Sequence, residues 1–78
     1  MPRIAIEISD DDAAGLAELA EQCTAADQER DGATTHGKLD VPALLAMLAQ
    51  DAAMVIARPG SWEGSKMADL LSSHGYEF

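Results

Sequence analysis

Aromatic residues are scarce in this chain of 78 residues, which contains only Trp62, Tyr76 and Phe78. Apolar residues make up 47 % of the sequence, which is too many for a disordered chain. Many of them are alanines, however, and alanine buries little surface. A chain this short lies near the lower limit for an unassisted hydrophobic core. We therefore expect one domain, residues 1–78, which is either a monomer or a homodimer, and which gains stability from a second copy or a partner.

Cysteine is nearly absent as well, because Cys23 is the only one. A lone cysteine forms no internal disulfide, so the sequence favours a reducing, cytoplasmic location. The N-terminus lacks the basic and apolar regions of a secretory signal. The longest apolar tract, residues 41–57, is interrupted by Pro42, Gln50 and Asp51 and is too short to cross a membrane. We expect no membrane segment.

Basic residues are few: five Lys and Arg stand against fourteen Asp and Glu, a net charge of -9. The sequence pI is about 4.2. Proteins bind phosphate backbones mainly with Lys and Arg, so the negative net charge disfavours direct binding of nucleic acid. It favours a basic partner, or serves only solubility.

Catalytic, phosphate-binding and metal-binding motifs are missing too. The sequence contains no nucleophile–base pair and no glycine-rich phosphate loop. The isolated candidate metal ligands have no metal-binding spacing: Cys23, His36 and His74. Asp51 falls on the apolar side of residues 41–57, where a carboxylate needs a partner such as Arg58, the Trp62 indole or a backbone amide. We expect no enzyme, no metal and no cofactor.

The first residues alternate strictly, with Ile4, Ile6 and Ile8 on one face of an extended chain. This period of two predicts a half-buried strand over residues 2–9. A single strand needs a pairing mate. Three mates remain open: the same strand of a second copy, the 33–38 loop and the 75–78 tail.

Helical spacing of apolar residues predicts three helices, at about 11–30, 41–57 and 62–73. Ser9 or, by preference, Asp10 caps the first helix, and Ser61 caps the last. Arg58-Pro59-Gly60 stops the second helix, and Gly75 ends the third. The predicted fold class is α+β: one N-terminal strand followed by three helices, of which the central, alanine-rich one is mostly buried.

Acidic residues concentrate in the first helix, since residues 7 to 31 hold nine acids and one base. Asp11, Glu18 and Glu29 fall on one side of the helix, with Glu21 nearby, in a row about 27 Å long. This row is either a solvated helix face or a negative surface that occupies a basic groove built for nucleic acid.

Trp62 lies between turn-forming residues in PGSWEG. Such a tryptophan either fills the gap between two helices or is an exposed anchor for a protein partner. The second possibility leaves room for a third kind of function, an accessory subunit that docks through Trp62 and the apolar central helix.

The first 23 residues, MPRIAIEISDDDAAGLAELAEQC, resemble the start of a ribbon-helix-helix regulator. The resemblance implies a dimer that pairs its N-terminal strands and reads the major groove with Arg3, Ala5 and Glu7. Only Arg3 suits that task, because Glu7 has the wrong sign for DNA. The loop before the next helix is also longer than in that family.

In size, charge and lack of catalytic motifs, the whole chain resembles the small acidic anti-CRISPR proteins of phages and mobile elements. The resemblance implies a non-enzymatic inhibitor that occupies a basic surface of a CRISPR surveillance complex and blocks target DNA. No site residues transfer from it. The expected partner-binding residues are Asp11, Glu18, Glu21 and Glu29, which are inferred from helical geometry, and Trp62 of PGSWEG. The alternative is a dimeric ribbon-helix-helix regulator or antitoxin.

Overall fold

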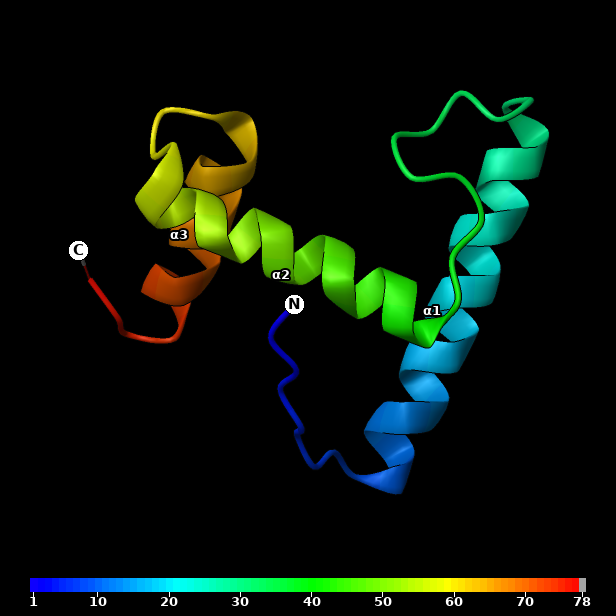
Figure 1. Cartoon of the computed structure of the whole chain (residues 1–78), viewed down its shortest axis with the longest axis horizontal. Coiled ribbons are helices and arrows are strands. Elements are labelled where there is room, and N and C mark those ends of the chain that lie inside the picture. Colours follow the sequence, from blue (N-terminus) through cyan, green and yellow to red (C-terminus); the bar gives the residue numbers. More distant parts are fainter. Residues whose placement is uncertain (78) are drawn as a thin grey trace. The chain divides into compact units, whose positions relative to one another are not determined.

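The computed structural model describes residues 1–77, and these residues form three helices and no strand. The helices are α1 (Asp10–Glu29), α2 (Val41–Ala57) and α3 (Trp62–Ser73), as Figure 1 shows. The α+β prediction is therefore wrong, and the fold class is all-α. The helices lie where the sequence predicts 11–30, 41–57 and 62–73, with α1 beginning and ending one residue earlier.

The predicted strand 2–9 is an extended segment that pairs with no other strand in the described chain (Figure 1). Neither the 33–38 loop nor residues 75–77 pair with it, and Phe78 lies outside the described residues. Ile4, Ile6 and Ile8 are 86 %, 66 % and 45 % exposed. Alternation alone does not make a strand, because a strand needs neighbours to satisfy its backbone groups and cover one face.

The chain divides into two compact units, Met1–Pro42 and Ala43–Phe78. Unit 1 contains the N-terminal segment (residues 1–9), α1 and the connector (residues 30–40). Unit 2 contains α2 from Ala43 onward, α3 and the C-terminal residues. The sequence prediction of one domain over residues 1–78 stays a prediction.

In unit 1, Ser9 rather than Asp10 caps α1. Ser9 is extended (φ -69°, ψ 158°), and its hydroxyl accepts a hydrogen bond of 3.0 Å from the backbone N–H of Asp12. Asp10, Asp11 and Asp12 occupy the first turn. There the partial positive charge of the helix N-terminus favours carboxylates. The preference for Asp10 as the cap is wrong because the preceding serine already fills that role.

At its other end, α1 closes with a left-handed turn. The N–H of Gly32 donates to the carbonyl of Asp27 at 2.9 Å, and the N–H of Asp31 donates to Gln28 at 3.2 Å. This pair of bonds is the Schellman arrangement, which places one residue in the left-handed region. That residue is Asp31, with φ 52°. A glycine is more usual there because a Cβ costs energy in that conformation.

In unit 2, α2 and α3 are joined by a tight turn. The Ser61 N–H donates to the Arg58 carbonyl at 3.0 Å, and the Ser61 hydroxyl caps α3 by accepting from Gly64 at 3.1 Å. Gly64 is buried against α2: a Cβ added there would lie 2.8 Å from the carbonyl oxygens of Met54 and Arg58. A side chain does not fit at this position, so glycine is what lets the helices come together.

The C-terminus of α3 has the predicted glycine end. Gly75 has φ 95°, and the Tyr76 N–H donates to the Leu71 carbonyl at 3.0 Å. The predicted caps Ser61 and Gly75 are thus confirmed. Both were identifiable because serine before a helix and glycine after it satisfy orphan backbone groups by local hydrogen bonds.

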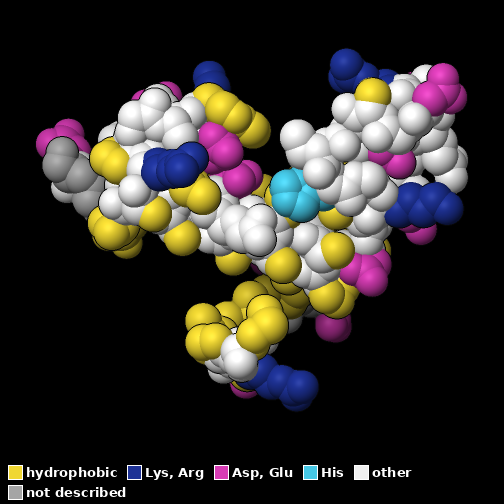
Figure 2. All heavy atoms as spheres, turned by 45° about the horizontal axis from the view of Figure 1, so that its top comes forward, with side chains coloured by type: hydrophobic (Ala, Val, Ile, Leu, Met, Phe, Trp, Pro, Cys, Tyr) yellow, Lys and Arg dark blue, Asp and Glu magenta, His cyan; other side chains and the backbone are white. Residues whose placement is uncertain are grey.

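The hydrophobic core is small. Among the described residues, only Ala20 and Leu44 are buried apolar side chains. The prediction of a mostly buried central helix is wrong, because α2 buries Leu44 alone and Ile56 is 84 % exposed. Figure 2 shows hydrophobic side chains distributed over the face that it draws. Alanine-rich helices of this length offer little side-chain volume with which to cover one another.

Among residues 1–77, none of the helices has by itself both the length and the apolar character to cross a membrane. Taken together, α2 and α3 have the length and apolar composition of a membrane-crossing segment, but the chain bends by 93° between them.

Candidate partner-binding surface

All four acidic residues singled out in the sequence lie on α1 and are exposed: Asp11, Glu18, Glu21 and Glu29. Within residues 1–77, none of them forms an ion pair with a lysine or arginine. Glu18 accepts only a long hydrogen bond, of 3.5 Å, from the Gln22 amide. Their negative charge is therefore left for solvent or a partner.

The four acids do not form one line. With about 100° between successive residues of an α-helix, Asp11, Glu18 and Glu29 point within about 20° of one another, whereas Glu21 is turned by about 80°. Glu21 instead lines a groove on the neighbouring side of α1. Asp11, Glu18 and Glu29, the row predicted from helical spacing, thus share one acidic face, and Glu21, predicted to lie nearby, is the carboxylate at the groove.

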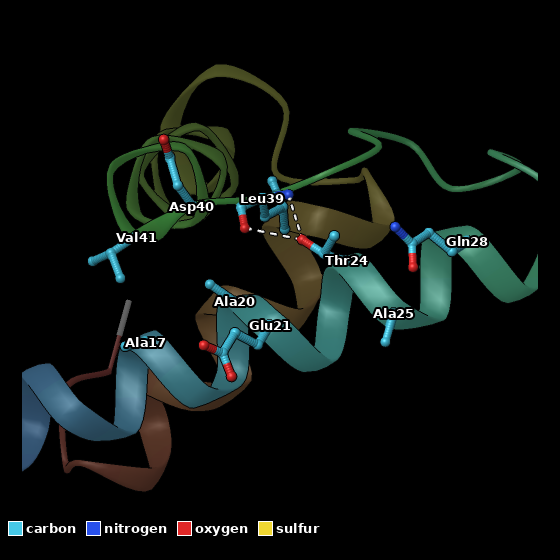
Figure 3. Close-up of a pocket in the computed structure, with 9 residues that line it drawn as sticks. All are labelled: Ala17, Ala20, Glu21, Thr24, Ala25, Gln28, Leu39, Asp40 and Val41. Carbon is cyan, nitrogen blue, oxygen red and sulfur yellow. Dashed lines mark hydrogen bonds between the residues drawn. The ribbon is translucent and has the colours of Figure 1, made fainter.

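The groove has a volume of about 430 Å³ and lies wholly within unit 1, between α1 and the end of the connector (Figure 3). Its walls are mostly apolar. They are formed by Ala17, Ala20, Glu21, Thr24, Ala25 and Gln28 of α1, and by Leu39, Asp40 and Val41. In Figure 3 the Asp40 side chain points away from α1, whereas Glu21 is part of the α1 wall itself.

Thr24 holds the second wall of this groove in place. Its hydroxyl accepts from the Leu39 N–H and donates to the Leu39 carbonyl, both at 3.0 Å (Figure 3). One hydroxyl therefore satisfies both backbone groups of a residue fifteen positions away. This replaces the hydrogen bonds that a sheet or helix would otherwise supply.

Asp27 makes a second attachment between α1 and the connector. This carboxylate is 6 % exposed and accepts a hydrogen bond from the Thr34 hydroxyl. The Thr34 hydroxyl in turn accepts from the Gly37 N–H at 3.1 Å. Because the connector is attached at Thr34 and again at Leu39, it returns alongside α1 and forms the groove (Figure 1).

Sequence reasoning missed both attachments. A signal for Asp27 was present, since it continues the stripe of Leu16, Ala20 and Cys23 at helical spacing. A carboxylate on an inward stripe requires a hydrogen-bonding partner. Thr24 gave no comparable signal, because its partner is a backbone group fixed only by the path of the connector.

Trp62 belongs to unit 2 and is 66 % exposed, so it does not fill a gap between helices. It lies in a different unit from the four acids. Asp51 is half-buried, and within the described chain it pairs neither with Arg58 nor with Trp62. The partner expected for Asp51 is therefore not found among residues 1–77, and solvent reaches its carboxylate instead.

The remaining polar candidates are dispersed. His36 shares a hydrogen bond of 2.9 Å between its Nδ1 and the Thr35 hydroxyl, and Cys23 is a half-buried free thiol. The described residues contain no group of three or more His, Cys, Asp or Glu able to hold a metal ion.

Comparison with known proteins adds no relative: no family model, curated protein or solved structure matches this chain.

Proposed function

We propose that this protein is a non-enzymatic acidic inhibitor that occupies a basic, nucleic-acid-binding surface, with a CRISPR surveillance complex as the partner. The observation that supports the proposal is the exposed acidic face of α1. Asp11, Glu18 and Glu29 share one side of the helix, and no cation within residues 1–77 neutralises them. Exposed helices commonly mix both signs of charge, so a face of one sign suits a basic partner.

In this mechanism the carboxylates take the places of phosphates on Lys and Arg side chains of the partner. A DNA duplex as long as the acidic row, about 27 Å, carries about sixteen charges. Four carboxylates replace only a fraction of them. The acids therefore govern association rate and orientation, and an exposed apolar anchor such as Trp62 supplies further binding energy.

The proposal is tested by competition with target DNA. A purified CRISPR surveillance complex is incubated with the protein and labelled target DNA, and the bound DNA is measured across a salt series. We expect inhibition by the wild-type chain to weaken as salt rises, because screening reduces attraction between exposed charges. Glu18→Lys with Glu29→Lys should weaken inhibition at every salt concentration.

A matched neutral variant, Glu18→Gln with Glu29→Gln, keeps the side-chain size and should give an intermediate result. Inhibition that is unchanged by salt and by both double variants would rule out the charge mechanism. No observation favours the ribbon-helix-helix alternative, since residues 1–77 contain no strand and Arg3 is the only base among residues 1–9.

A further inference from the structure

The N-terminal segment, residues 1–9, presents three isoleucines to solvent. Ile4, Ile6 and Ile8 are all exposed. In an extended chain, side chains two residues apart point to the same face, so these three form one apolar edge about 13 Å long. Single exposed apolar residues are ordinary, but a contiguous exposed apolar edge marks a contact surface.

The groove of unit 1 matches this edge in length and character. Its α1 wall extends from Ala17 past Ala25, and these two residues are about 12 Å apart along the helix axis. Most of its walls are apolar, formed by alanine methyl groups together with Leu39 and Val41. An edge of three isoleucines therefore covers most of the α1 wall, which ends at Gln28, about 16 Å from Ala17.

Charge favours this occupant. The N-terminal segment has one base, Arg3, and one acid, Glu7, so it is neutral. The rest of unit 1 carries nine acids and two bases, a net charge of -7. The segment can approach the groove without net repulsion, and Arg3, which precedes Ile4, brings a cation toward Glu21 at the groove wall.

We propose that the groove of one copy of this chain binds the N-terminal segment of a second copy, and that the exchange is reciprocal. The segment does not cover the groove of its own unit, as the exposure of Ile4 and Ile6 shows. A two-fold dimer makes each contact twice. One segment in one groove is a small contact compared with the 1,200–2,000 Å² or so that stable protein interfaces bury. Making this contact twice therefore strengthens the dimer.

The experiment measures the oligomeric state of the full-length chain by sedimentation over a range of concentrations. Wild type should be a dimer that dissociates on dilution. Ile6→Asp introduces a charge into the apolar edge, and Ala25→Gln places a polar side chain in the groove. Each should raise the dissociation constant about a hundredfold, because each contact is lost twice.

A matched control is Ala26→Gln, an exposed alanine of the same helix that does not line the groove. It should leave the dimer unchanged. The side chains of Ile6, Ala25 and Ala26 are all exposed, and circular dichroism verifies that the helices persist. A charge exchange, Arg3→Glu with Glu21→Arg, should restore dimerisation that Arg3→Glu alone weakens.

Two results would overturn the inference. One is a wild-type monomer at every concentration. The other is a dimer that Ile6→Asp dissociates but Ala25→Gln does not, since this indicates that the segments pair with each other and leave the groove empty. Neither result bears on the acidic inhibitor proposal, because that proposal depends on Asp11, Glu18 and Glu29, and none of these residues lines the groove.

Discussion

The two units of this chain differ in how they are held together and in what they present to solvent. Unit 1 carries ten acids and three bases, a net charge of -7, whereas unit 2 carries four acids and two bases, a net charge of -2. In unit 1, side-chain hydroxyls and a buried carboxylate attach the connector to α1. In unit 2, a glycine lets two helices approach.

The two units are therefore stabilised by different kinds of contact. In unit 1, 13 of the 42 residues are charged, and specific polar contacts hold the connector in place. Unit 2 contains the alanine-rich helix and the exposed Trp62, and backbone proximity at Gly64 takes the place of a large core. The predictions below separate the two modes of stabilisation, beginning with the largest effect.

Gly64→Ala should destabilise unit 2 by about 3 kcal/mol, because the new Cβ meets two backbone oxygens that cannot rotate away. Thermal or denaturant unfolding followed by circular dichroism measures the loss. The control is Gly15→Ala on α1, which has open space around it. That change should stabilise the chain by about 0.5–1 kcal/mol, since alanine favours a helix over glycine. Equal effects of the two changes would contradict the account of Gly64.

Asp27→Ala should destabilise unit 1 by about 2 kcal/mol, because the Thr34 hydroxyl loses its charged acceptor in a buried setting. Amide hydrogen exchange should also become faster at Gly37, whose N–H bonds to the same hydroxyl. Glu29→Ala, at an exposed carboxylate of the same helix, serves as the control and should change stability little. Unchanged exchange at Gly37 would show that the connector is held by other contacts.

Ser61→Ala should cost about 1 kcal/mol, the usual loss when an N-cap hydroxyl is removed. The hydroxyl caps Gly64 and also donates to the Arg58 carbonyl at 2.7 Å, so both ends of the turn lose a bond. Ser65→Ala, at an exposed serine inside α3, provides the comparison and should be neutral or slightly stabilising. The measurement is the unfolding free energy in urea.

Asp31→Gly should stabilise unit 1 by about 0.5–1 kcal/mol, because glycine adopts the left-handed conformation without the Cβ penalty. Thr35→Gly, at a residue whose φ is not positive, should destabilise instead, since it adds freedom to the unfolded chain and removes the hydroxyl that bonds to His36. The sign of the two changes in melting temperature is the readout. A loss of stability in Asp31→Gly would mean that the aspartate side chain stabilises the turn.

Local patterns predicted the helices well. Apolar spacing located α2 and α3, and Arg58-Pro59-Gly60, Ser61 and Gly75 marked where one helix ends and the next begins. These signals act through hydrogen bonds between residues only a few positions apart, so the residue types that form them can be read from the sequence. The exposed acids on α1 were found in the same way, because helical geometry alone places them.

Long-range features escaped prediction. The strand over residues 2–9 failed because alternation of Ile4, Ile6 and Ile8 does not supply a pairing neighbour. The bond between Thr24 and Leu39 joins residues fifteen positions apart, and the groove depends on that bond together with the one between Asp27 and Thr34. Helical geometry places Glu21, but the groove beside it depends on where the connector returns, which no local pattern encodes.

The central claim is that recognition depends on where the charges of unit 1 lie and not on net charge alone. It is tested most directly by comparing two double charge reversals that alter net charge equally. Glu18→Lys with Glu29→Lys changes the acidic face of α1, and Asp69→Lys with Glu77→Lys changes exposed acids of unit 2. Inhibition of the CRISPR surveillance complex by each variant is measured at one fixed, physiological salt concentration. We expect the α1 variant to inhibit at least about tenfold more weakly than the unit 2 variant, a difference of about 1.4 kcal/mol. Equal losses in the two variants would contradict the claim.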